Sequence, residues 1–138
     1  MSNKTAVSVV VPVYNQELFI GRCLRSLLDQ TLDKESYEIV VVNDCSKDNT
    51  LPILEKFKNK IKLINNKKNM GLPYSLNRGI KSAQGRFIVR VDSDDYVNRE
   101  FLNFLQMYLL YNPKMDSVCC DYYLVDDKEN IIKQMDSL

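Results

Sequence analysis

The spacing of apolar and polar positions changes along the chain in a regular way. Residues 7–13 and 37–42 are β-branched runs that are typical of strands buried on both faces. Residues 17–30 instead show the i, i+3, i+4, i+7 and i+8 spacing of an amphipathic helix. The apolar positions of that helix are Ile20, Cys23, Leu24, Leu27 and Leu28. The chain therefore opens with a predicted strand, a helix and a second strand.

The same alternation continues through the rest of the sequence. The pattern predicts further helices after residue 48 and over residues 72–83 and 98–111, and strands over residues 61–64, 87–91 and, less regularly, 116–125. Gly85 is expected to end the helix over residues 72–83, and residues 126–138 form a charged tail in this interpretation. Strands and helices that alternate through short connections predict an α/β protein with three layers (α/β/α), in which a mainly parallel sheet lies between helices.

The strand over residues 87–91 ends in three carboxylates within four positions, Asp92, Asp94 and Asp95. If the extended conformation continues, Asp92 and Asp94 project to one side of the chain. Carboxylates this close require solvent or a cation between them. A divalent ion held by one or two carboxylates keeps positions for water and for the phosphates of a nucleotide. The pattern leaves two interpretations open, an exposed acidic turn and a divalent metal site.

Polar clusters follow three of the predicted strands, at residues 12–15, 43–46 and 92–95. In an open α/β sheet, ligands bind beyond the carboxyl ends of the strands. We therefore expect the three clusters to face one cleft, although each alone could be ordinary turn chemistry. The chain has neither a G-x-G-x-x-G motif after its first strand nor a Walker loop, which excludes the dinucleotide-binding and P-loop classes.

Composition narrows the chemistry further. The 138 residues are 45% hydrophobic, which predicts one globular domain with its own core. The absence of histidine excludes histidine triads and histidine metal ligands, and a net charge of +1 argues against nucleic acid as a partner. Four cysteines without CxxC spacing, and no apolar run of membrane length, lead us to expect a cytoplasmic protein. The lysine-rich residues 56–68 are interpreted as a solvated edge. The alternative is a patch that binds phosphate or anionic lipid, the latter at the inner face of the membrane.

Four motifs together resemble the family 2 glycosyltransferases, which have the Rossmann-like GT-A fold. They are residues 9–15 (VVVPVYN), 42–48 (VNDCSKD), 69–79 (NMGLPYSLNRG) and 85–95 (GRFIVRVDSDD), and they occur in the order and spacing of that family. The resemblance implies binding of a nucleotide-diphosphate sugar, most often a UDP-sugar. It also implies metal-assisted transfer of the sugar, with inversion, to a glycan, lipid or protein acceptor, as in the synthesis of cell-surface polysaccharides.

The resemblance also implies roles for individual residues. Tyr14 would stack on the uracil ring, unless it is a core aromatic, and Asp44 would accept a hydrogen bond from the uracil imide, unless it caps a helix. Asp92 would bind the ribose hydroxyls, and Asp94 would bind Mg²⁺ or Mn²⁺. The other candidate nucleotide-sugar-binding residues are Pro12, Asn15, Ser46, Asn77, Arg78 and Ser93. For Asn77 and Arg78 helix packing is the alternative, and Gly71 and Gly79 are expected to serve backbone geometry.

The sequence also departs from the family pattern. Asn43 stands where the family often has an acid, and Cys45 where it has glycine, either as a small substitute or as a partly exposed thiol. Family enzymes continue into an acceptor-binding region that supplies the general base, whereas this chain ends about forty residues after Asp95. We therefore expect a fragment without the base, which self-associates as a dimer through its last third. The alternative function is a non-catalytic nucleotide-binding or oligomerisation module.

Overall fold

The structure is a computed structural model that describes residues 5–136. The chain divides into two compact units, Met1–Asn103 and Phe104–Leu138. The first unit contains a parallel sheet with its helices, and the second contains a β-hairpin.

The first unit is built around a four-stranded parallel sheet with the strand order β3-β2-β1-β4. The strands are β1 (Val7–Val13), β2 (Tyr37–Asn43), β3 (Lys62–Asn65) and β4 (Phe87–Arg90). In the register of the sheet, Val9 of β1 lies between Ile39 of β2 and Val89 of β4. The two central strands are buried along almost their whole length, as their β-branched sequences predict.

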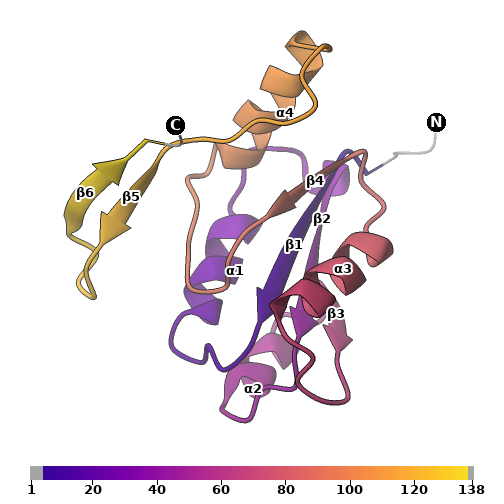
Figure 1. Cartoon of the computed structure of the whole chain (residues 1–138), viewed down its shortest axis with the longest axis vertical. Coiled ribbons are helices and arrows are strands. Elements are labelled where there is room, and N and C mark those ends of the chain that lie inside the picture. Colours follow the sequence, from indigo (N-terminus) through magenta and orange to yellow (C-terminus); the bar gives the residue numbers. More distant parts are fainter. Residues whose placement is uncertain (1–4, 137–138) are drawn as a thin grey trace. The chain divides into compact units, whose positions relative to one another are not determined.

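Helices cover both faces of this sheet (Figure 1). They are α1 (Ile20–Leu28) and α2 (Thr50–Glu55) on one face and α3 (Leu72–Ser82) on the other, and a short 3-10 helix (Lys34–Ser36) precedes β2. On the first face, Val9 and Val11 share one buried cluster with Leu24 and Leu54. Each such side chain stabilises the fold by about 1.5–3 kcal/mol through burial alone. The predicted α/β fold with three layers is confirmed.

Gly79 sets how closely α3 approaches the sheet. A Cβ atom at this position would collide with the side chain of Val10 in β1 and would press on Val42 in β2. The absence of a side chain therefore lets α3 lie directly on both strands. This close approach brings the residues before α3 to the carboxyl ends of β1 and β2.

Gly85 does not end α3, so that prediction is wrong. The helix ends at Ser82 with Ala83 as its C-cap, and the backbone of Ala83 is extended there. Gly85 instead lies against β1, where a Cβ atom would meet the backbone of Ser8. Its N–H donates to Oγ of Ser8 at 2.8 Å, which fixes the start of β4 beside β1.

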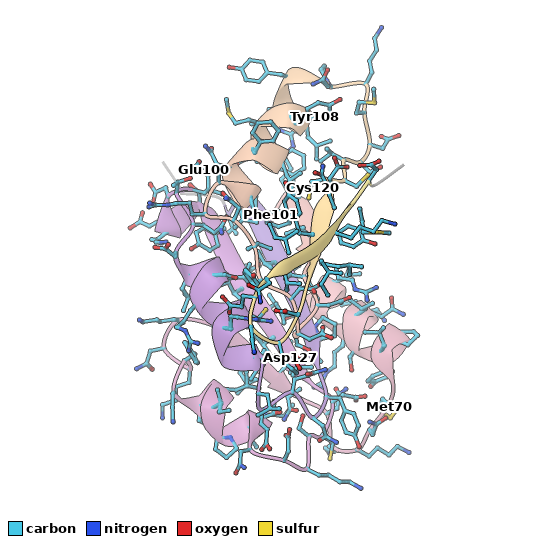
Figure 2. The ribbon with its side chains drawn as sticks, turned by 90° about the vertical axis from the view of Figure 1, so that its left-hand side faces the viewer. Met70, Glu100, Phe101, Tyr108, Cys120 and Asp127 are labelled. Atoms are coloured by element: carbon cyan, nitrogen blue, oxygen red, sulfur yellow. The ribbon has the colours of Figure 1, made fainter. Side chains whose placement is uncertain are left out.

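Helix α4 (Phe101–Tyr111) begins in the first unit and continues into the second. Glu100 and Phe101 stand at its start in Figure 2. The helix begins at Phe101 rather than at residue 98 because Asn98 forms the preceding turn, in which its Oδ1 accepts the N–H of Glu100 at 2.9 Å. Neither α4 nor any other helix within residues 5–136 is long and apolar enough to cross a membrane.

The second unit contains an antiparallel hairpin of β5 (Tyr122–Val125) and β6 (Ile131–Met135). Two predictions are therefore wrong, because the strand predicted over residues 116–125 begins only at Tyr122 and the supposed charged tail contains a strand. Asp126 builds the turn, since its Oδ1 accepts the N–H groups of Lys128 and Asn130, both at 2.8 Å. The charges of the supposed tail thus gather in the turn, where Figure 2 marks Asp127.

Candidate functional site

A cleft of about 310 Å³ lies at the carboxyl ends of β1, β2 and β4 in the first unit. It is lined by Pro12, Val13, Tyr14, Gln16, Asp44, Asn69, Gly71, Leu72, Ser75, Arg90, Asp92, Ser93 and Asp94. The structure thus brings the three polar clusters to one cleft, as expected for a parallel sheet. Of the predicted site residues, the cleft is lined by Pro12, Tyr14, Asp44, Asp92, Ser93 and Asp94, and not by Asn15, Ser46, Asn77 or Arg78.

Asp44 is the most extensively bonded carboxylate of the cleft. Its Oδ1 accepts the side-chain amide of Asn66 at 2.6 Å and the N–H of Met70 at 2.9 Å, and its Oδ2 accepts the N–H of Gly71 at 2.8 Å. Burial alone would raise the pKa of this carboxyl, but the hydrogen bonds from Asn66 and the two backbone groups outweigh burial and lower it. Asp44 is therefore an anion at neutral pH and can only accept hydrogen bonds.

The partners of Asp44 are themselves held by a second set of hydrogen bonds. The amide of Asn66 also donates to Oγ of Ser75 at 2.9 Å, and Arg78 donates through Nη1 to Oδ1 of Asn66 and to the carbonyl of Asn65. Arg78 thus acts on Asp44 through Asn66 and does not line the cleft. Asn77 is exposed on α3. Asp44 does not cap α2, the helix that follows it; it binds the residues just before α3.

Asn15 and Ser46 join two loops beside the cleft. The N–H of Asn15 donates to Oγ of Ser46 at 3.0 Å, and Oδ1 of Asn15 accepts the N–H of Lys47 at 2.8 Å. Asn15 and Cys45 both adopt left-handed backbone conformations, with φ of 51° and 62°. Buried Asn43 uses both ends of its amide here, since it donates to Asn65 and accepts from Ser46. An acid at position 43 could accept from Ser46 but could not donate to Oδ1 of Asn65.

Tyr14 presents its ring at the opening of the cleft. Its side chain is 40% exposed and does not belong to the buried core cluster. This exposure does not fit the interpretation of a core aromatic. Because Pro12 and Val13 line the cleft directly before it, the ring stands where β1 ends and can offer one face to a planar ligand.

The acidic loop, residues 92–95, is a turn and not a continuation of β4. The N–H of Asp95 donates to the carbonyl of Asp92 at 3.1 Å, which closes the turn. The prediction that strand alternation aims Asp92 and Asp94 to one side is therefore wrong, although both line the cleft. The Asp92 carboxylate is held by Arg90 in a bidentate pair, with 2.7 Å from Nε to Oδ1 and 2.9 Å from Nη2 to Oδ2.

Charge gathers in the acidic loop. Burial raises the pKa of the Asp95 carboxyl, and the neighbouring Asp94 and Asp92 raise it further, while Arg22 and Arg90 oppose these effects. The Cys23 thiol lies beneath the loop, and burial, together with these carboxylates, raises its pKa to about 12. Cys23 is therefore a neutral thiol, and its Sγ lies 3.6 Å from the Asp92 carbonyl as a weak donor. The loop is a local concentration of negative charge with two arginines beside it.

Comparison with known proteins decides the family of this chain. Residues 8–137 match the family model of Glycosyl transferase family 2. The chain belongs to that family. The match extends over nearly the whole sequence, so the resemblance carried by the four motifs is confirmed.

Individual family 2 proteins support the same assignment. Poly(ribitol-phosphate) beta-N-acetylglucosaminyltransferase TarS of Staphylococcus aureus (strain Mu50) is 47% identical over 98 residues, which are 69% of this chain and 17% of TarS. The putative glycosyltransferase EpsH of Bacillus subtilis is 40% identical over 96% of this chain and 37% of its own length. A crystal structure of S. aureus TarS 1-349 in complex with UDP-GlcNAc matches this chain with a TM-score of 0.72 and 42% identity. The match covers 77% of this chain and 31% of the TarS chain in that structure. The GT-A fold is thus confirmed, and the chain spans less than two fifths of each of these relatives.

The carboxylates of this family 2 chain suit a hard cation that takes its remaining ligands from a nucleotide and from water. Within residues 5–136 there is no group of three or more acids, cysteines or histidines that could hold a metal ion. The protein itself offers Asp94, which is exposed, and Asp92, which Arg90 already engages. Mg²⁺ commonly takes one or two carboxylates and completes its shell with phosphates and water. The donor set is therefore compatible with such an ion.

Sequence reasoning missed the two side chains that hold the carboxylates of Asp44 and Asp92. Asn66, which holds Asp44, directly follows β3, so the rule that ligand sites lie at the carboxyl ends of parallel strands could have indicated it. Arg90 is a charged residue at the end of the apolar strand β4, and a charge in such a position signals a nearby partner. Arg90 acts through Asp92, two residues later, whereas Asn66 acts through a partner that is distant in the sequence.

Proposed function

We propose that this chain binds a UDP-sugar in the cleft and forms the donor-binding part of an inverting glycosyltransferase. The observation that carries the proposal is that an exposed aromatic ring, a buried ionised carboxylate and an acidic loop line one cleft of about 310 Å³. Small-ligand pockets in proteins measure roughly 300–1,000 Å³. The related TarS 1-349 was crystallised in complex with UDP-GlcNAc, which favours uridine as the base.

Tyr14 and Asp44 supply the features needed to recognise uracil. The exposed ring of Tyr14 offers a stacking surface, which is worth about 1–3 kcal/mol for a nucleic-acid base. Oδ1 of Asp44 accepts from Asn66 and Met70, Oδ2 accepts from Gly71, and the Ser75 side chain also hydrogen-bonds this carboxylate. A ligand donor would therefore replace the Ser75 bond. Because Asp44 is ionised, any ligand group that binds it must be a hydrogen-bond donor. The uracil imide provides one, and cytosine has none at that position.

The acidic loop supplies the features needed for the ribose and the diphosphate. We assign the Asp92 carboxylate to the ribose hydroxyls, with Arg90 holding its orientation through the bidentate pair. We assign the exposed Asp94 carboxylate to Mg²⁺ or Mn²⁺, whose chemistry when bound is to neutralise charge on the departing diphosphate. Four predicted residues contact no ligand in this proposal and instead shape the loops and α3 around the cleft. They are Asn15, Ser46, Asn77 and Arg78.

An inverting transfer also requires a base that takes the proton of the acceptor hydroxyl. We assign no residue of this chain to that task. Asp126 is engaged in the hairpin turn, where the amide of Asn130 lowers its pKa. We propose that residues outside this chain provide the base and bind the acceptor, whether a glycan, a lipid or a protein.

Calorimetric titration with nucleotide sugars in the presence of Mn²⁺ tests the proposal. We expect UDP-GlcNAc or UDP-glucose to bind, and the corresponding cytidine nucleotide to bind more weakly because it lacks the imide N–H. A parallel assay for released UDP shows whether the chain also catalyses turnover. Binding of a UDP-sugar without release of UDP would favour the non-catalytic nucleotide-binding module. If no uridine nucleotide binds, both the glycosyltransferase and the nucleotide-binding module are contradicted.

We further propose that the chain self-associates as a dimer through the second unit. This unit exposes several large apolar side chains, namely Phe104, Met107, Tyr108, Leu110 and Tyr111 of α4 and Tyr122, Tyr123, Leu124, Ile131 and Ile132 of the hairpin. Apolar surface of this kind is typical of protein interfaces, and free strand edges pair readily. Sedimentation at micromolar concentration is expected to show a dimer, and a monomer of 16.1 kDa would contradict the proposal.

A further inference from the structure

A polar stripe runs along one face of α1 and includes Gln30, just after the helix. Its side chains hydrogen-bond the segment between β4 and α4. Oγ of Ser26 accepts the N–H of Val97 at 3.1 Å. Gln30 donates through Nε2 to the carbonyl of Asn98 and accepts the N–H of Leu102 through Oε1, both at 2.9 Å. Ser26 and Gln30 are four residues apart, as expected for side chains on one helix face.

Arg22 extends this stripe by one turn toward the acidic loop. Its Nη2 donates to the backbone carbonyl of Asp94 at 3.1 Å. The guanidinium carbon lies 4.4 Å from the ring centroid of Tyr96, just after the loop, and 5.7 Å from that of Phe19. The planar guanidinium is thus fixed by two rings and hydrogen-bonds the main chain of the loop, a geometry that an ammonium group cannot reproduce.

The hydrogen bond leaves the carboxylate of Asp94 available. Nη2 of Arg22 donates to the carbonyl of Asp94, and the Asp94 side chain is exposed where it lines the cleft. The positive charge beside the loop also opposes repulsion among its carboxylates. The contact therefore fixes where the Asp94 main chain lies without consuming the oxygens that would bind a ligand.

We propose that Arg22 is a positioning residue that sets the place of Asp94 for binding the diphosphate end of the donor together with its metal ion. The inference rests on the proposed function, because it concerns the same cleft. It assigns no ligand contact to Arg22, which acts through the main chain of the acidic loop. The bonds that hold Asp44 come from the residue after β3 and the segment before α3, so we expect Asp44 to stay in place when Arg22 is substituted.

The test compares Arg22→Met with the parent chain by calorimetric titration of uridine and of UDP with Mn²⁺. Methionine keeps an unbranched apolar stem but cannot donate to the Asp94 carbonyl. We expect affinity for UDP with Mn²⁺ to fall at least about tenfold, as for other residues that support a metal ligand, and affinity for uridine to stay unchanged. Arg22→Lys, which keeps the charge without the planar fork, is expected to recover only part of the loss.

Arg25→Met is the matched control, because Arg25 is an exposed residue on the same helix, and we expect it to change neither affinity. Parallel loss of uridine and UDP affinity in Arg22→Met, with a lower melting temperature, would show general structural support and overturn the inference, as would unchanged affinities. If Arg22→Met does not fold, Arg22→Lys is judged by the same criteria. A parent chain that binds neither uridine nor UDP would overturn the proposed function itself, and the inference with it.

Discussion

On one side of the cleft, the Asp44 carboxylate is buried and accepts hydrogen bonds from Asn66, Met70 and Gly71. On the other side, the Asp94 carboxylate is exposed, and Arg22 holds this residue by its backbone carbonyl. Asp44 is therefore fixed through its carboxylate, and Asp94 is fixed through its main chain. In the proposed function, the Asp44 carboxylate serves stability and recognition together, whereas the Asp94 carboxylate serves recognition alone. Substitutions on the two sides should accordingly separate effects on stability from effects on binding.

Asp44→Asn is expected to show the largest effect on stability. An amide offers a single acceptor oxygen, so donors from Asn66, Met70 and Gly71 would compete for it and one would face an N–H₂ group. Hydrogen bonds to a charged group contribute about 1.5–3 kcal/mol each, and we expect the free energy of unfolding to fall by about 3 kcal/mol. Urea denaturation measures this change. The matched control Asp94→Asn, at an exposed position, is expected to change stability by less than about 0.5 kcal/mol; equal losses in both variants would contradict the comparison.

The stability contributed by Asp44 should also depend on pH in a defined direction. Its pKa is lowered in the folded state, so the contribution is fully present above the unfolded pKa of about 3.9 and is lost as pH falls through the folded pKa. We expect the difference in unfolding free energy between the parent and Asp44→Asn to be constant near neutral pH and to narrow in acid. A difference that grows as pH falls would have the wrong sign for this account.

Tyr14→Ala is expected to affect binding and leave stability nearly unchanged. Removal of the stacking surface should weaken UDP and uridine alike by about 2 kcal/mol, while inorganic diphosphate binding stays the same. Calorimetry with the three ligands measures this pattern. A loss of cooperative unfolding in Tyr14→Ala would instead show that the ring belongs to the core.

Cys45→Gly is expected to have the smallest effect, and of the opposite sign. Cys45 adopts φ of 62°, which costs a residue with a side chain roughly 1–2 kcal/mol, and the greater freedom of glycine in the unfolded chain offsets part of this gain. We expect a net stabilisation of about 0.5 kcal/mol. Asn15→Gly, at φ of 51°, is the control, because it also loses the bond from Lys47 and should destabilise. Destabilisation of Cys45→Gly would show that the thiol makes an important contact.

The sequence predicts the fold of the first unit well because the residues that favour strands there are also the buried ones. The β-branched run of β1 is typical of a strand buried on both faces, and the polar ends of β1, β2 and β4 meet at one edge of a parallel sheet. The hairpin was missed because β6 is exposed along nearly its whole length and shows no period that separates it from a tail. Its pairing depends on a turn built by Asp126, which local composition does not specify.

The sequence predicts which residues belong to the candidate site better than it predicts how they are arranged. Strand alternation extends to Asp94 only if the chain stays extended, but the chain turns after β4, because contacts from α1 and the turn bond of Asp95 determine its path. The partner of Asp92 is Arg90, two residues earlier, and the partner of Asp44 is Asn66, from another strand end. The pairing of Asp44 with Asn66 arises from the three-dimensional arrangement and leaves no periodic trace in the sequence.

The central claim is that the acidic loop binds a diphosphate together with a metal ion through Asp94. Titration of UDP with and without Mn²⁺, on the parent and on Asp94→Asn, tests it most directly. We predict that Mn²⁺ raises the UDP affinity of the parent at least about tenfold and that Asp94→Asn loses this gain while keeping its metal-free affinity, since an amide is a poorer ligand for a hard cation. Equal UDP affinity with and without Mn²⁺ in the parent, or an undiminished gain in Asp94→Asn, would contradict the claim.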